Sequence, residues 1–441
     1  MDRLMMISTD GHAGGRVDDY ARYMPGSYLE AFREWKGHVR AALARIPRDA
    51  EAAGLLNVPS VFSEDVRNGW ITNPKVTDGS RSGAWDPEVR LRELHGEGFV
   101  GEVIFPGPQV FECQIPFGGG LGMAAGAPPE LAWVGHHAFN QWLAEFVDPV
   151  VQAGIAQVPT LKDIDRIVQE IRWAAEAGLR GVQLPSDEDN VPLLYHERYG
   201  PVWEALVETN LTLVFHSGAG AVRSQDRNGV ALQARGMSPE SLAVACIEMH
   251  WHSHRPLWHL LIGLVFERFP TLRVMFTEAQ ADWVPRTLAY LDDRLTGSGA
   301  RRLSPLDELR RRMSLKPSEY WLRQCFVGAS SCTAFEMSMR HEIGLRTLTF
   351  GVDYPHIEGT WPNTLNWLRL ICCEVPEDEL RDVLGRNACR AFGFDEVELK
   401  GLANEYGATV GDVLETRPCF ADKRIRWKVE SAALSKAVAR P

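Results

Sequence analysis

Histidine and carboxylate side chains stand at the ends of several short apolar runs in this sequence. Asp10 and His12 end the first run, and their i, i+2 spacing places both side chains on one side of an extended chain. His216, Glu278 and Asp353 end three later runs. Histidine nitrogens and carboxylate oxygens bind divalent cations, and they also carry protons in catalysis. These five residues therefore predict one shared metal site.

Each of these residues taken alone also has a structural explanation. A histidine at the end of a strand is commonly a hydrogen-bonded structural residue. Asp10 before Gly11, and Asp353 before Tyr354, are also typical of turns. Five such residues at the ends of four runs are less easily explained in this way, which favours the metal site.

Eight apolar runs recur along the chain and alternate with segments of helical periodicity, such as residues 164–177. The runs cover residues 5–10, 102–106, 153–159, 181–185, 211–216, 273–278, 325–328 and 348–353. Strands that alternate with helices predict a parallel sheet, and eight units predict closure into a (β/α)₈ TIM barrel. The alternative is an open doubly wound sheet, but no GxGxxG motif follows the first run. In a barrel, the ends of the strands meet at one mouth, where active sites lie.

The predicted barrel occupies residues 1–420 as one unit. Residues 13–90 do not fit the repeating pattern, and because they follow the first strand we expect a large insertion over the active-site face. The glycine-rich residues 117–128 predict a covering loop rather than a phosphate-binding loop, since they lack the strand-to-helix setting. Residues 421–441, which contain several basic side chains, predict a solvated C-terminal extension.

The composition excludes several classes of function. The formal net charge of −11 argues against nucleic acid as a partner. No stretch has the roughly 18 apolar residues of a membrane span, and the N-terminal apolar run is too short for a signal peptide. The eight cysteines form no CxxC pair, which indicates free thiols in a reducing compartment. We therefore expect a cytoplasmic protein with a small-molecule substrate, no membrane association and, by default, a homodimer.

A second group of histidines lies between the fifth and sixth runs. One of His250 and His252 is expected to transfer protons or to support a metal ligand, and His252 is taken as the catalytic residue. His254 and His259 are expected to pack instead. His356, three residues beyond the last aspartate, is either a metal or substrate contact or a turn residue.

Three arginines follow the fifth run and offer bidentate binding of a substrate carboxylate, although a solvated loop is the simpler interpretation. They are Arg223, Arg227 and Arg235.

Four motifs together resemble the amidohydrolase superfamily. They are Asp10-Gly-His12, Phe215-His216-Ser-Gly, Thr277-Glu278-Ala-Gln-Ala-Asp-Trp283-Val-Pro and Gly351-Val-Asp353-Tyr-Pro-His356. The branch they resemble contains aminocarboxymuconate-semialdehyde decarboxylase and the resorcylate-type decarboxylases. The resemblance extends from residue 5 to residues 385–395, which are similar to the family's closing helix.

The resemblance implies a set of ligands and also shows departures from the family pattern. The implied metal ligands are Asp10, His12, His216 and Asp353, with Glu278 and His356 as further candidates. Asp10 stands where many members have histidine, and Glu278 stands where many have a sixth-strand histidine. The fourth run offers Gln183 instead of the lysine or glutamate that bridges two metals in binuclear branches. These departures imply one metal, or an unusual second site.

The leading hypothesis is an enzyme that hydrolyses or decarboxylates a small organic acid or ring compound with a metal-activated water. The metal would be Zn, Mn or Fe, because the donor set is rich in oxygen and contains no cysteine. Asp353 would take up a proton during the reaction, and Glu278 or His252 would be the second acid or base.

Two other functions remain open from the sequence. The first is a nonheme oxygenase with two Fe and an electron-transfer partner, which would hydroxylate a natural-product intermediate. The chain is similar in length to an amidohydrolase-like diiron monooxygenase of platensimycin-type terpenoid biosynthesis, and Glu278 with His252 or His356 would complete its second iron site. The other is a barrel without catalysis that serves as a binding protein.

Overall fold

The computed structural model describes residues 3–43, 80–110, 112–118, 127–217, 221–222, 250–296 and 304–414. Eight parallel strands form one sheet in the order β1-β2-β3-β4-β6-β8-β9-β10. They are β1 (Met6–Ser8), β2 (Phe99–Ile104), β3 (Gln152–Gln157), β4 (Gly181–Gln183), β6 (Thr212–His216), β8 (Val274–Thr277), β9 (Cys325–Ser330) and β10 (Leu348–Gly351). Every one of the eight predicted runs overlaps one of these strands.

The last strand returns to the first and closes the barrel. The backbone N–H of Thr9 donates to Phe350 O at 2.9 Å, and the hydroxyls of Thr9 and Thr349 lie 2.7 Å apart. Just beyond the strands, the N–H of Asp353 donates to Asp10 O at 2.9 Å. These contacts place Asp353 beside Asp10, and they confirm the predicted (β/α)₈ barrel.

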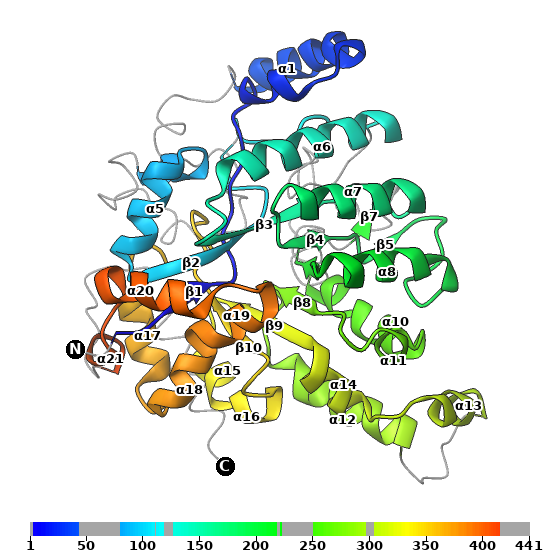
Figure 1. The fold of residues 1–441 in the computed structure, drawn as a ribbon, viewed down its shortest axis with the longest axis vertical. Coiled ribbons are helices and arrows are strands. Elements are labelled where there is room, and N and C mark those ends of the chain that lie inside the picture. The colour runs from blue at the N-terminus through cyan, green and yellow to red at the C-terminus, as the bar shows by residue number, and fades with distance from the viewer. Residues whose placement is uncertain are drawn as a thin grey trace, which may run out of the picture.

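Helices surround the strands (Figure 1). Those between the strands are α5 (Pro87–Gly96), α6 (Pro129–Phe146), α7 (Ile164–Glu176), α8 (Gly200–Thr209), α10 (Pro256–Ile262), α11 (Val265–Arg268), α12 (Trp283–Thr296), α13 (Ser304–Arg312), α14 (Pro317–Gln324), α15 (Ala334–Ser338) and α16 (Arg340–Ile343). After the last strand come α17 (Thr364–Cys372), α18 (Glu377–Arg381), α19 (Asn387–Phe392), α20 (Glu396–Tyr406) and α21 (Val410–Leu414). The two-residue strands β5 (Asp187–Glu188) and β7 (Ala221–Val222) pair separately.

Helix α7 shows how the sequence determines where a helix begins and which face of it is buried. The side chain of Asp163 accepts a hydrogen bond from the N–H of Arg166 and so caps the first turn. Ile167, Ile171 and Ala174 are buried at helical spacing, whereas the intervening positions are mostly less buried. The strands, in contrast, are almost entirely buried, as expected when helices cover a parallel sheet.

The helices after β10 cover the end of the barrel where the strands begin. Thr212, the first residue of β6, donates through its hydroxyl to Ala391 O, and the amide of Asn387 donates to Leu348 O at 2.6 Å. Apolar side chains of α19 and α20 join those of β1 to β3 in one buried cluster. Because this end is covered, a substrate has to approach from the end where the strands finish.

The predicted insertion differs from the structure at its end. Helix α5 begins at Pro87, within the predicted 13–90 range, and its first turn is capped by the Asp86 side chain. It packs against β2 as a barrel helix, so residues 87–90 belong to the repeating unit. Helix α1 (Leu29–Leu43) lies at the edge of the molecule on the α6 side (Figure 1). Residues 44–79, 119–126 and 421–441 lie outside the described residues, as do the three arginines of the fifth-strand loop.

The six cysteines in the described part of the chain are free thiols, and five of them are buried. Among the same residues, every helix is too short or too polar to cross a bilayer.

Candidate metal centre

The predicted donor residues lie together where four barrel strands end. Asp10 and His12 follow β1, His216 ends β6, Glu278 follows β8 and Asp353 follows β10. Together with His356 and Glu358, their ligand atoms form three overlapping groups, within each of which all the atoms lie within 4.8 Å of one another. The structure thus brings together all six metal-ligand candidates of the sequence and adds a seventh.

Three histidines are each oriented by a backbone carbonyl. The Nδ1 of His12 donates to Pro106 O at 2.6 Å, and the Nδ1 of His216 donates to the carbonyl of the next residue at 2.6 Å. His356 uses its other nitrogen, Nε2, which donates to Gly107 O at 2.7 Å. A carbonyl can only accept, so these nitrogens carry a proton, and in the neutral form of each ring the opposite nitrogen offers its lone pair. This arrangement is typical of histidines that bind metals.

The opposite nitrogens of His12 and His216 face two aspartates. His12 Nε2 and His216 Nε2 each lie 3.4 Å from Asp10 Oδ1, and His12 Nε2 lies 3.3 Å from Asp353 Oδ1. Two ligands held about 2.1 Å from one ion at tetrahedral or octahedral angles lie roughly 3.0–3.4 Å apart. His12 Nε2 and Asp353 Oδ1 are both buried, and they face each other and the neighbouring donors of the site. Spacing and burial fit a divalent cation held by Asp10, His12 and His216, with Asp353 beside His12.

The carboxylates are fixed by the backbone and by a serine. Ser330, at the end of β9, donates its hydroxyl to Asp10 Oδ2. Asp353 and Glu278 both adopt left-handed backbone conformations, with φ of 62° and 52°. Such conformations are unfavourable for residues other than glycine and cluster at functional sites, where the surrounding structure holds them. The sequence analysis did not single out Ser330, although its position at a strand end was a usable signal.

Glu358 is the donor that the sequence analysis missed. Its Oε1 lies 3.6 Å from His356 Nδ1, and both of its carboxylate oxygens accept from Gln109 Nε2 at 2.9 Å. It belongs to one donor group with Glu278, Asp353 and His356. Its signal in the sequence was its position two residues after a histidine in the loop that follows a site-bearing strand.

Burial and neighbouring charges act in opposite directions on the acids of the site. Burial favours the neutral form of Asp10, but hydrogen bonds with His12 and His216 outweigh it, and the pKa of Asp10 lies well below its usual value. Burial raises the pKa of Glu278 and of Glu358. The two glutamates are therefore the carboxylates whose negative charge is least compensated by the protein itself.

The pair formed by Asp353 and His356 behaves differently. Burial disfavours the imidazolium of His356, but the carboxylate of Asp353 outweighs this effect and raises the pKa of His356 to about 10. In turn, the histidines around Asp353 lower its pKa against the effect of burial. The two groups thus form a strong electrostatic pair, with His356 Nδ1 2.9 Å from Asp353 Oδ1.

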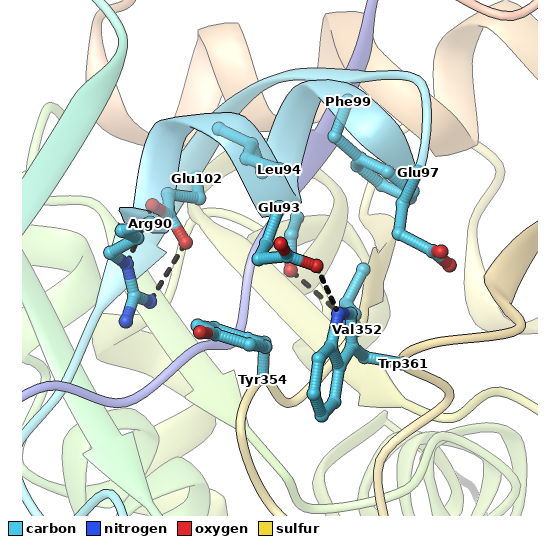
Figure 2. Close-up of a pocket in the computed structure, with 10 residues that line it drawn as sticks. Arg90, Glu93, Leu94, Glu97, Phe99, Glu102, Val352, Tyr354 and Trp361 are labelled. Carbon is cyan, nitrogen blue, oxygen red and sulfur yellow. Dashed lines mark hydrogen bonds and ion pairs between the residues drawn. The ribbon is translucent and has the colours of Figure 1, made fainter. Parts of the chain in front are cut away.

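A buried arginine contacts the backbone of His12, and Figure 2 shows its guanidinium paired with Glu102. Arg90 binds both carboxylate oxygens of Glu102 at 2.8 Å, and its Nη1 donates to the backbone carbonyl of His12 at 2.7 Å. Gln152 also donates to Glu102 at 2.8 Å, and the Arg90 guanidinium lies 5.1 Å from the centre of the Tyr354 ring. Arg90 therefore fixes the backbone of a metal-ligand candidate without contacting the metal position.

A cavity of about 20 Å³ adjoins this arginine, with room for about one water molecule. Arg90, Glu93, Tyr354 and Trp361 are among its lining residues, and Trp361 Nε1 donates to Glu93 at 3.3 Å (Figure 2). Its lining includes none of the seven donor residues. The cavity is thus separate from the donor residues of the metal centre.

The second group of histidines lies beside the centre. His250 Nδ1 is 3.2 Å from both Ser217 Oγ and the Glu278 carbonyl oxygen. His252 belongs to none of the donor groups found among the described residues, and its catalytic role stays a prediction. His254 donates to a backbone carbonyl at 2.8 Å and stacks on an aromatic ring, which is the packing role expected of it.

Residues 126–394, more than half of the chain, match the sequence profile of the family described as Amidohydrolase. The chain belongs to the amidohydrolase family. This finding confirms the resemblance inferred from the four motifs. A search of curated protein sequences found no match for this amidohydrolase.

Solved structures share the fold of this amidohydrolase at low sequence identity. An amidohydrolase from Mycobacterium avium subsp. paratuberculosis is 16% identical, with a TM-score of 0.62, and the aligned region covers 89% of this chain and 100% of that protein's chain. The 5-carboxyvanillate decarboxylase from Sphingomonas paucimobilis is 18% identical, with a TM-score of 0.56 and the same coverage. A dihydroxybenzoic acid decarboxylase from Polaromonas sp., with bound manganese and the inhibitor 2-nitroresorcinol, is 15% identical, with a TM-score of 0.53, and covers 88% of this chain and 97% of its own.

Proposed function

We propose that this amidohydrolase is a metal-dependent enzyme that releases carbon dioxide from a small aromatic or related organic acid. Hydrolysis of a similar compound is the other reaction open to the same site. The observation that carries the proposal is the convergence of His12 Nε2 and His216 Nε2 on the carboxylates of Asp10 and Asp353, each histidine fixed by a backbone carbonyl. Decarboxylation is favoured because similar structures include two kinds of aromatic-acid decarboxylase.

A divalent cation bound here would polarise a substrate oxygen or a coordinated water. The residues of the chain would position the substrate and move a proton. In decarboxylation the bond between the ring and the carboxylate carbon breaks, carbon dioxide leaves, and the ring carbon gains a proton. Glu278 would deliver this proton, because its side chain is 15% exposed, whereas Asp353 is 2% exposed. Its exposure also allows solvent to restore the proton.

Asp353 has a positioning role in this proposal. Its backbone N–H is bound by the carbonyl of Asp10, and its left-handed conformation fixes where the carboxylate points. His12 and His356 approach the same carboxylate oxygen, at 3.3 and 2.9 Å. Asp353 therefore aligns the site, and it would take up a proton if water is the attacking group.

The test uses protein loaded with Mn²⁺ and a panel of hydroxylated benzoic acids. We expect carbon dioxide release in the wild type, and loss of at least about 100-fold in Asp353→Asn and Glu278→Gln. His216→Ala should lose metal as well as activity. The exposed residue Glu204 gives a matched control, and Glu204→Gln should keep full activity. Unchanged turnover in Asp353→Asn would contradict the proposal.

A nonheme iron oxygenase is a second candidate, because Glu278, His356 and Glu358 offer further donors next to Asp353. This function would require two Fe and an electron-transfer partner. The two candidates differ in their need for oxygen: decarboxylation continues at the same rate under anaerobic conditions, whereas hydroxylation stops. Oxygen consumption that depends on an added reductant would favour the oxygenase.

A further inference from the structure

We propose that Gln183 determines the substrate specificity of this amidohydrolase, because its side-chain amide forms a hydrogen bond with a hydroxyl group of the substrate. The inference rests on the proposed function and deepens it. It narrows the substrate class to acids that carry a hydroxyl group, and no second charge, on the side that faces β4.

Gln183 is the last residue of β4, and its side chain points into the barrel. A methyl group at Gly181, two residues earlier, would lie 2.8 Å from Ile155 Cδ1 and 3.5 Å from Val214 Cγ2. Both of these side chains belong to the buried cluster to which β1, β2, β3, β6, β8 and β9 all contribute, so they lie inside the barrel. Side chains two residues apart on a strand share one face. Gln183 therefore projects inward as well, two residues nearer to the end of the barrel where the strands finish.

The same periodicity places Gln183 beside the metal centre. Strand β4 pairs with β6 through Gln183 and Val214, and His216 lies two residues after Val214 on the same inward face. Gln183 and this metal-ligand candidate thus occupy the same end of neighbouring strands. The predicted donors lie at the ends of β1, β6, β8 and β10, whereas the ends of β2, β3 and β4 carry uncharged residues, namely Phe105, Gln157 and Gln183. The barrel mouth therefore has a charged side and a neutral side.

The side-chain amide of Gln183 is buried and not fully hydrogen-bonded. Gln183 is 5% exposed, and its Oε1 is buried without a hydrogen-bond partner among the residues that the structure describes. Gln157, its register partner on β3, differs in this respect, because its Nε2 donates to the carbonyl of Ile155 at 2.8 Å. A buried amide oxygen without a partner is unfavourable, and at the end of a barrel strand it points to a ligand that completes its hydrogen bonding.

The chemistry of an amide selects the group that it binds. An amide has an acceptor oxygen and a donor nitrogen, and rotation of the amide exchanges their positions. A hydroxyl group suits either orientation because it both donates and accepts. A carboxylate or an ammonium group would instead bring a charge that no residue of the neutral side balances. The competing explanation is a buried water molecule on Gln183 that has no contact with the substrate.

The test measures binding, so it does not depend on turnover. The reference ligand is 2-nitrophenol, which has no carboxylate to lose. An added hydroxyl at each of its free ring positions gives 2-nitroresorcinol, 2-nitrohydroquinone, 4-nitroresorcinol and 3-nitrocatechol. Calorimetry gives the dissociation constants for Mn²⁺-loaded wild type and for Gln183→Met, which keeps the length of the side chain and removes the amide. We expect at least one added hydroxyl to tighten binding about 10-fold in the wild type, and Gln183→Met to abolish this gain without weakening 2-nitrophenol.

Two further measurements separate recognition from folding. Gln183→Met should not lower the melting temperature of the ligand-free protein, because it removes a buried oxygen that has no partner. Gln157→Met removes the neighbouring amide, whose nitrogen already donates within the protein, so it should lower the melting temperature and keep the gain from the added hydroxyl.

Several results would overturn the role of Gln183. They are the absence of any gain from an added hydroxyl in the wild type, a gain that survives in Gln183→Met, and an equal loss for 2-nitrophenol and the dihydroxy compounds. If hydroxylated acids release carbon dioxide equally fast in the wild type and in Gln183→Met, this inference fails while the proposed function stands. If the nitro compounds behave as expected but no acid releases carbon dioxide, Gln183 keeps its role and the proposed function fails.

Discussion

The buried arginine behind the metal centre gives the sharpest test of how the barrel supports its site. Arg90 and Glu102 are 0% and 3% exposed, and their paired contacts at 2.8 Å hold two opposite charges away from water. Removing one partner of such a pair typically lowers the free energy of unfolding by about 3–5 kcal/mol, because the other charge stays buried without compensation. In Arg90→Met, the neutral amide of Gln152 still donates to Glu102 but does not balance its charge, so we expect a loss in this range.

The double variant Arg90→Met/Glu102→Gln removes the stranded charge, so it should be more stable than Arg90→Met alone. Urea unfolding of the metal-free proteins, followed by circular dichroism, measures both free energies. Arg90→Met also removes the donor to the His12 carbonyl, so Mn²⁺ affinity at the metal centre should fall by about 10-fold. A loss of stability below about 1 kcal/mol, or a double variant less stable than the single one, would refute this account.

Three further predictions concern the metal, a buried histidine and a packed glycine. Mn²⁺ at 100 times its dissociation constant should raise the free energy of unfolding by about 2.7 kcal/mol over chelated protein, and calorimetry that shows no rise in melting temperature would contradict the site. Burial and the charge of Arg255 lower the pKa of His259 to about 4, so the folded protein binds fewer protons than the unfolded chain between this pH and 6.5. The free energy of unfolding should therefore fall as pH drops through that window, by up to about 1.4 kcal/mol per pH unit from this group. In His259→Gln the free energy of unfolding should depend less steeply on pH, and equal slopes in the variant and the wild type would refute the assignment. A methyl group at Gly135 in α6 would lie 1.7 Å from Pro116 O, so Gly135→Ala should lose about 1–3 kcal/mol in urea unfolding, whereas Gly401→Ala, in open space on α20, should gain up to about 1 kcal/mol.

Much of the fold could be predicted from the sequence because buried parallel strands leave a local signature. Each barrel strand is a short apolar run, and the periodicity of segments such as α7 marks the helices between them. The end of the insertion was harder to place. Asp86 and Pro87 are a usable start signal for α5, but the mixed composition before them obscured it.

The candidate site could be predicted where donors follow strands directly. Asp10, His216 and Asp353 are placed by the strands themselves, so their convergence follows from barrel closure. Glu358 lies farther along a loop, and its direction depends on the path of the chain after the left-handed Asp353. A local pattern does not determine that path. Arg90 was missed for another reason: a charged residue on a helix is usually exposed, and only the position of Glu102 explains its burial.

The closing contacts between β1 and β10 also constrain the order of events when the protein is made. Asp10 is synthesised at the start of the barrel, whereas Asp353 follows its last strand. The donor residues of the metal centre are therefore not yet together in a nascent or partly folded chain. Loading of the cation must follow the meeting of the two strands, so the cation secures a completed barrel and does not guide its assembly. Release of a bound ion would likewise report the separation of β1 from β10.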